Sequence, residues 1–210
     1  MSTETTITET YAQAASSQSI DKTKNALEAK GIAVYVVDTP AAAKDQLLKL
    51  IPQGASVGSG ASLTLDESGI TAALDGGAYD YVRKRAFAMD RETQADEIRR
   101  LLATPDYMVG SAHAVTEDGS LLFGSMSGSQ IGPYASGAGK IVWVVGSQKI
   151  VPDVEAGLER LREYSLVLES ERARKAYGIP GSALNNILII NGTAAKGRLT
   201  VILVRQPIGF

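Results

Sequence analysis

Apolar residues along the chain gather in short continuous runs that alternate with segments of mixed polarity. Continuous runs rich in β-branched residues are typical of strands covered on both faces, whereas apolar residues three to four positions apart predict amphipathic helices. The continuous runs predict strands at 32–37, 55–57, 79–82, 107–110, 140–145, 186–190 and 199–204. The mixed segments predict helices at 22–30, 40–51, 91–103, 152–164 and 170–177, with a short helix through Glu67.

Capping and turn residues set the ends of several of these elements. Asp21 stands where it caps the first helix, and Gly31 stands where that helix ends in the left-handed region. The run 113–124 indicates two strands joined by a turn at Glu117-Asp118-Gly119, which predicts a hairpin and therefore a mixed sheet. Because strands and helices alternate over most of the length, the predicted fold class is α/β, with a mostly parallel, mixed central sheet flanked by helices.

The chain of 210 residues is long enough for one domain with a substantial core. Residues 1–16 are rich in Thr, Ser and Glu and are predicted to form a flexible tail, which leaves 17–210 as a single domain. The N-terminus lacks a basic and an apolar targeting region, and no segment reaches the roughly 18 apolar residues of a membrane span. A cytoplasmic protein that does not enter the membrane is therefore expected.

Composition narrows the chemistry. Cysteine is absent, which excludes disulfides, thiolate metal sites, a cysteine nucleophile and an iron–sulfur cluster held by this chain. His113 is the only histidine, so a multi-histidine metal centre is excluded as well, and no metal site is predicted. The 21 basic and 23 acidic residues form no basic block, so nucleic-acid binding has no support. Carboxylates, hydroxyls, lysines and backbone amides remain for any chemistry.

A glycine turn follows the strand at 55–57. Gly58, Ser59 and Gly60 precede a helix start, and the unpaired N–H groups there, together with Ser62, predict a site for an anion or a carboxylate. The turn is not a dinucleotide fingerprint, because Leu63 stands where the third glycine is needed. A purely structural turn explains the same pattern equally well.

The segment 106–151 is also rich in glycine and carries further candidates. His113 precedes Glu117 by four positions, so both side chains share one face if the strand continues that far, and His113 is a candidate general acid or base. A histidine hydrogen-bonded in the core is the commoner case. Glu67 lies about one helical turn after Ser62 and either pairs with the glycine turn or is an exposed first-turn carboxylate.

Lys149 follows the buried strand predicted at 140–145 and comes just before a predicted helix. Loops after the carboxyl ends of parallel strands face the ligand crevice, where a cation suits a carboxylate or a phosphate; a solvated loop lysine is the alternative. The predicted crevice lies between the loops 58–64, 113–119, 128–132 and 146–149. Besides the residues already named, the expected substrate-binding positions in it are Thr116, Gly119, Gly128, Gln130 and Gly146.

Several blocks of the sequence, in their order and spacing, resemble the LUD family, the domain of lactate-utilisation proteins of the LutC/YkgG type. They are IPQGASVGSGASLTLDESGI, AHAVTEDGSL, GSQIG, VVGSQKIVPDVEAGLERLR and ILIINGTAAKGRLTVILVRQPIGF. The chain departs from the family pattern where relatives often have Asn in place of His113 and Gly-Asn-Arg in place of 128–130, and it lacks the cysteine-rich segment of some members. These departures leave the substrate and any cluster-related role open.

The resemblance implies a fold similar to the NagB/RpiA/CoA-transferase superfamily. It also implies a role in oxidising L-lactate to pyruvate beside an iron–sulfur partner and an oxidoreductase partner, with a small carboxylate or its activated form as ligand. Glu117 resembles the glutamate of CoA transferases that attacks an acyl-CoA, so CoA or a similar ligand is one expectation. An ordinary hairpin turn at Glu117 is the alternative, and a non-catalytic assembly or regulatory subunit is the alternative to an enzyme.

Overall fold

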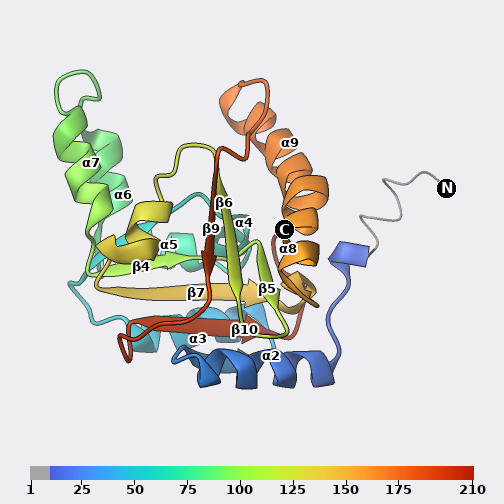
Figure 1. The fold of residues 1–210 in the computed structure, drawn as a ribbon. Helices are drawn as coiled ribbons and strands as arrows, with labels where there is room; N and C mark the ends of the chain where they lie inside the picture. The colour runs from blue at the N-terminus through green and yellow to red at the C-terminus, as the bar shows by residue number, and fades with distance from the viewer. Residues whose placement is uncertain (1–9) are drawn as a thin grey trace.

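The computed structural model describes residues 10–210 and builds them around a six-stranded sheet (Figure 1). All neighbouring strands in it run parallel. In spatial order they are β1 (Ala33–Val37), β10 (Leu199–Val204), β7 (Lys140–Gly146), β4 (Tyr107–Gly110), β2 (Ser56–Ser59) and β3 (Asp80–Tyr81). The predicted fold class, α/β with a mostly parallel central sheet and flanking helices, is confirmed.

A second, four-stranded sheet contains the antiparallel pairs. Its order is β8 (Ile150–Val151), β5 (Ala114–Thr116), β6 (Leu121–Ser125) and β9 (Asn186–Ile190). The predicted hairpin forms between β5 and β6, and β9 extends it. These pairs do not join the central sheet, because the chain leaves that sheet after β4 and the hairpin packs its apolar side chains across one face of it.

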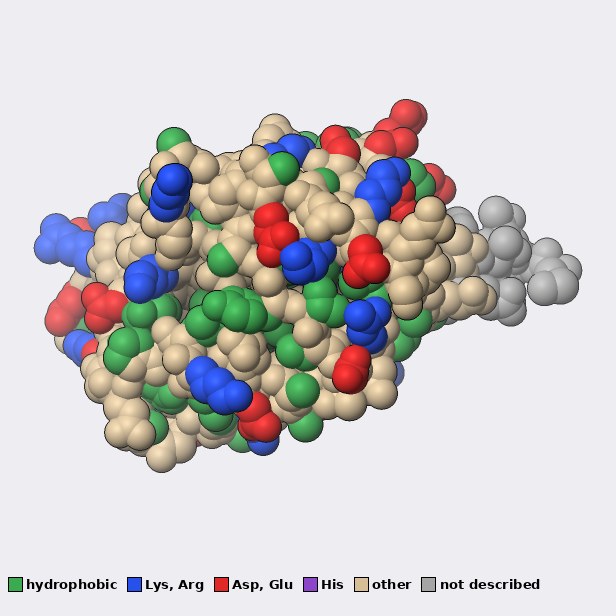
Figure 2. Space-filling model, turned by 90° about the horizontal axis from the view of Figure 1, so that it is seen from below, with side chains coloured by type: hydrophobic (Ala, Val, Ile, Leu, Met, Phe, Trp, Pro, Cys, Tyr) green, Lys and Arg blue, Asp and Glu red, His purple; other side chains and the backbone are tan. Residues whose placement is uncertain are grey.

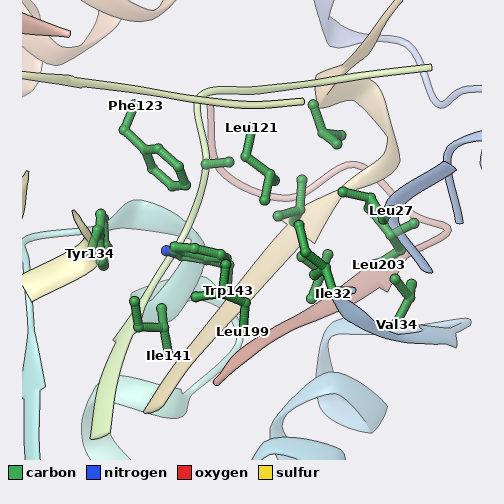
Figure 3. Packing of buried hydrophobic residues seen from close by; sticks show 14 of the residues in the cluster. Leu27, Ile32, Val34, Leu121, Phe123, Tyr134, Ile141, Trp143, Leu199 and Leu203 are labelled. Carbon is green, nitrogen blue, oxygen red and sulfur yellow. The ribbon is translucent and has the colours of Figure 1, made fainter. Parts of the chain in front are cut away.

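Helices and the second sheet share the two faces of the parallel sheet. One face packs against α3 (Pro40–Leu50), α4 (Leu63–Glu67) and α5 (Ile70–Asp75). The other packs against α2 (Ser17–Ala29) and the β5–β6 hairpin. Close to the hairpin, the rings of Phe123, Tyr134 and Trp143 meet with centroids 4.9 to 5.4 Å apart (Figure 3). Such distances suit tilted and edge-on aromatic packing.

The remaining helices stand to either side of β6 and β9 (Figure 1). One pair is α6 (Val82–Ala88) and α7 (Ala95–Ala103). On the other side, α8 (Val154–Arg160) continues through one π-helical segment into α9 (Leu166–Tyr177). The basic residues 83–85 lie within α6, and α9 begins four residues before the predicted start at 170.

Two local expectations are wrong. The first helix begins at Ser17 and is capped by Ser16, whose hydroxyl accepts a hydrogen bond from the Ser19 N–H at 3.1 Å, so Asp21 lies inside the helix. The strand β1 is at the sheet edge and leaves Tyr35 40% exposed, so it is not covered on both faces. The helix end is as predicted, since Gly31 adopts a φ of +83°.

Part of the predicted flexible tail, residues 1–9, lies outside the described residues. The part from residue 10 onward contacts the domain. The Tyr11 ring lies 5.8 Å from the Tyr164 ring, and the Ala15 N–H donates to the Ser147 hydroxyl at 3.3 Å.

The surface mixes charges of both signs. On the face seen from below, Lys and Arg side chains alternate with Asp and Glu (Figure 2). Over residues 10–210, none of the helices has both the length and the apolar character that crossing a membrane requires.

Candidate functional site

A cavity of about 240 Å³ opens at the carboxyl ends of β2, β4 and β7, three neighbouring strands of the parallel sheet. Gly60 follows β2, Ser111 follows β4, and Lys149 lies in the short 3₁₀ turn after β7. The hairpin contributes Gly124 and Ser125, and α9 closes another side. This is the edge at which parallel sheets bind ligands. We call this space the lysine cavity.

Lys149 is the central polar group of the lysine cavity. Its side chain is only 1% exposed, and its Nζ donates to Thr64 Oγ1 at 2.8 Å and to Ser111 Oγ at 3.1 Å. Burial lowers the pKa of Lys149 well below its ordinary range, and the positive charge of Arg160 lowers it further. Glu67 opposes this effect, but among residues 10–210 no carboxylate forms an ion pair with Nζ.

His113 lines the same cavity as an uncharged ring. Its Nδ1 accepts a hydrogen bond from the Gly124 N–H at 3.2 Å, so the neutral ring carries its proton on Nε2. Burial, followed by the charges of Lys149 and Arg160, lowers the pKa of His113 to about 3. The predicted role as a general acid or base at neutral pH therefore does not fit, and His113 is instead available as a hydrogen-bond donor.

Glu117 lies outside the lysine cavity, at the opposite end of the hairpin. Its Oε1 accepts from the Ser19 hydroxyl at 2.7 Å and its Oε2 from Lys22 Nζ at 2.8 Å. These two hydrogen bonds and the charge of Lys22 lower the pKa of Glu117. The expectation that this turn faces the glycine turn at 58–60 is wrong, because β5 and β6 run antiparallel and carry the turn onto α2.

The neighbours of Glu117 belong to the same structural turn. Thr116 is buried and its hydroxyl accepts from the Ser120 N–H at 2.8 Å. Gly119 has a φ of +86°, and a Cβ there would lie 2.8 Å from the backbone of Ala26. Thr116 thus stabilises the turn, Gly119 allows the turn to approach α2, and neither residue lines the lysine cavity, contrary to their predicted role.

A second cavity, of about 520 Å³, lies between β2, α6 and α7. The guanidinium groups of Arg83 and Arg91 lie 5.3 and 5.5 Å from the centre of the exposed Phe87 ring. We call this space the arginine cavity. The predicted residues Gly58 and Ser59 line it, both within β2 rather than in a loop. Residues common to both cavities are Gly60, Ala61, Ser127, Ser129 and Gln130.

Three other predicted residues support the sites without lining them. Glu67 accepts a hydrogen bond from the Gly209 N–H at 2.8 Å and so holds the last residues near Thr64. Gly128 adopts a φ of +77° in the loop between the cavities. Gly146 ends β7, where a Cβ would lie 2.8 Å from the backbone nitrogen of Ile208. The predicted residues that do meet in the lysine cavity are Gly60, Ser62, His113, Gln130 and Lys149.

Several residues that line or support the lysine cavity were not predicted from the sequence. Ser111 follows β4 directly, so the rule on strand ends would have found it. Thr64 lies in the first turn of α4, and no pattern links it to Lys149. Arg172 lies on α9 and forms two hydrogen bonds with Glu169, at 2.7 and 2.8 Å. No sequence pattern predicts it, because only the tertiary fold brings α9 to the cavity.

The chain is an α/β protein with a cavity at the carboxyl edge of its parallel sheet. The chain belongs to the LUD-domain family, whose sequence model matches residues 20–204, and this family is associated with lactate utilisation. A solved structure similar to this chain is that of a DUF162 family protein from Deinococcus radiodurans. It is 14% identical, with 89% of this chain and 96% of that chain covered and a TM-score of 0.47. No curated protein matches the sequence.

Proposed function

We propose that this protein acts in lactate utilisation by binding a small carboxylate, L-lactate or pyruvate, in the lysine cavity. The observation that carries the proposal is the isolation of Lys149, a buried amine whose hydrogen-bond partners are the hydroxyls of Thr64 and Ser111. Family membership supplies the choice of acid.

A bound carboxylate would complete the charge balance of the lysine cavity. Buried charges are stable when paired, and attraction between charges is stronger away from water. The carboxylate therefore raises the pKa of Lys149, and Lys149 takes up a proton as the ligand binds. His113 lines the same cavity, and its Nε2, which carries the proton, would donate to the C2 oxygen of the acid.

The oxidation itself needs an electron acceptor, and we assign that role to partner proteins. The family resemblance implies that an iron–sulfur protein and an oxidoreductase accept the electrons. The acyl-transfer alternative is not carried forward, because the Glu117 carboxylate lies outside both cavities and is already bound by Ser19 and Lys22.

Calorimetric titration with L-lactate, pyruvate and lactamide tests the proposal. Lactamide has the shape of lactate without its charge, so it should bind at least roughly tenfold more weakly. Lys149→Met should abolish binding of both acids, whereas Lys196→Met, a change at an exposed loop lysine, should leave it intact.

Equal binding of lactamide, or unchanged binding by Lys149→Met, would show that Lys149 does not recognise the carboxylate. If neither acid binds while an oxidoreductase is retained from co-expression, the chain is an assembly subunit and the proposal fails. Circular dichroism of both variants establishes that they are folded.

A further inference from the structure

The hydrogen bonds of Lys149 Nζ are those expected of a nucleophilic amine. Two of its N–H bonds point to Thr64 Oγ1 and Ser111 Oγ. Each of these hydroxyls gives its own hydrogen to a backbone carbonyl, that of Ile208 at 3.4 Å and that of Ala112 at 3.2 Å, so each accepts from Nζ. An uncharged amine has two hydrogens and one lone pair. Both hydrogens are therefore in use, and the lone pair is left free.

The surroundings of Nζ favour this uncharged form. The charged and titratable groups that act on Lys149 are Arg160, which lowers its pKa, and Glu67, which raises it; burial outweighs both. The pKa of His113, at about 3, leaves that ring without a charge at neutral pH. Lysines that lose their charge through burial are the ones that act as nucleophiles toward carbonyl groups.

We propose that Lys149 forms a reversible imine with a 2-oxo acid of the size of pyruvate in the lysine cavity. The choice of acid rests on the proposed function. Lys149 with bound pyruvate exchanges between its protonated and uncharged forms, and only the uncharged form reacts. Its lone pair on Nζ attacks the C2 carbonyl carbon, and the carbonyl oxygen takes one hydrogen from the nitrogen to give a carbinolamine. The carbon–oxygen bond then breaks, the second amine hydrogen leaves with the oxygen as water, and a carbon–nitrogen double bond remains. No electrons are gained or lost overall, so no oxidant or reductant is required.

Only one of the two acids of the proposed function, pyruvate, can form this imine. L-Lactate has a hydroxyl at C2 and cannot form an imine, so it binds through charge and hydrogen bonds alone. Pyruvate has the carbonyl that the amine attacks. Protonation of the resulting imine places a positive charge close to the carboxylate of the bound acid, which stabilises the adduct in this buried space.

Reductive trapping tests the imine in the wild-type protein. Pyruvate and sodium cyanoborohydride are added at pH 7, and the protein is digested and mapped by mass spectrometry. One adduct is expected, heavier by pyruvate plus two hydrogens less one water, on Lys149 and at roughly tenfold or more the level on exposed Lys196. An excess of L-lactate should reduce the adduct, because both acids occupy the same cavity.

Variants and calorimetry separate the failure of the imine from the failure of the proposed function. Lys149→Met should remove the adduct and Lys196→Met should retain it; if Lys149→Met does not fold, the mapping of wild-type protein still decides. Heat of pyruvate binding without an adduct on Lys149, or equal labelling of exposed lysines, overturns the imine and leaves the proposed function standing. No heat with either acid and no adduct overturn both.

Discussion

Tyr134 fits its place because residue 110 has no side chain. A Cβ at Gly110 would lie 1.7 Å from the Tyr134 hydroxyl oxygen, far inside contact distance. Tyr134 is 3% exposed, lines the lysine cavity and packs on Phe123 and Trp143. One wall of the lysine cavity therefore depends on a glycine at the end of β4.

Gly110→Ala should lower the free energy of unfolding by about 1–3 kcal/mol, because the added methyl displaces the Tyr134 ring. Combining it with Tyr134→Phe should recover part of the loss, since the atom that clashes most is then absent. Urea unfolding measures both. The matched control is Gly132→Ala, where φ is −58° and a Cβ would have open space. Equal losses at positions 110 and 132 would refute this account.

His113 makes the fold sensitive to acid. Its pKa is about 3 in the folded protein against an ordinary value of 6.5, so between these pH values the unfolded chain binds more protons than the folded one. Stability is therefore lost as pH falls from 6.5 toward 3, by on the order of 1.4 kcal/mol per pH unit from this residue alone.

His113→Asn should reduce that loss, because the Asn side chain has an oxygen that can accept the Gly124 N–H but does not titrate. Unfolding by urea at pH 6.5 and pH 4.5 gives the comparison. The same loss of stability in the wild type and in His113→Asn would mean that other groups account for the acid sensitivity.

At the scale of elements, the start of α2 shows which of two possible residues caps the helix. Ser16 and Asp21 are both residues that cap helices well, and the sequence pattern favoured Asp21 because the apolar periodicity starts after it. The observed helix starts five residues before the predicted start at 22, and Ile20 in this added part belongs to the buried cluster against one face of the parallel sheet. Burial of one apolar side chain thus moves the helix start.

Ser16→Ala should cost about 1 kcal/mol of stability, because the Ser19 N–H then loses its acceptor. Asp21→Ala, at an exposed position within the helix, should change stability by less than about 0.5 kcal/mol. Chemical denaturation of both variants measures the two effects. A larger loss of stability for Asp21→Ala than for Ser16→Ala would show that Asp21 is the cap after all.

At the scale of the whole molecule, the sequence predicted the parallel sheet well and the site in part. Buried strands such as β7 and β10 are apolar runs rich in β-branched residues, so their position follows from the local sequence pattern. The placement of Glu117 does not, because it depends on which sheet the hairpin joins. The rule on strand ends predicts Lys149 and applies equally to Ser111, whereas the contact between Lys149 and Thr64 is formed only by the tertiary fold.

The charge state of Lys149 should make acid binding depend on pH. L-Lactate binds with uptake of one proton once the pH exceeds the pKa of Lys149 in the free protein, so its affinity should fall as pH rises, by up to tenfold per pH unit. Titrations between pH 6 and pH 9, in buffers of different ionisation enthalpy, measure the affinity and the proton uptake together. Constant affinity with no proton exchange would mean that Lys149 keeps its charge throughout.

The ring contact between Trp143 and Tyr134 provides an optical probe inside the protein. Trp143 is the single tryptophan, it is fully buried, and Tyr134 connects it to the lysine cavity. Its fluorescence therefore comes from one environment only. A shift to longer wavelength reports that water has reached the core, whereas a change in intensity at constant wavelength reports that a ligand has moved the Tyr134 ring. A single emission spectrum can thus follow both unfolding and occupancy without any label.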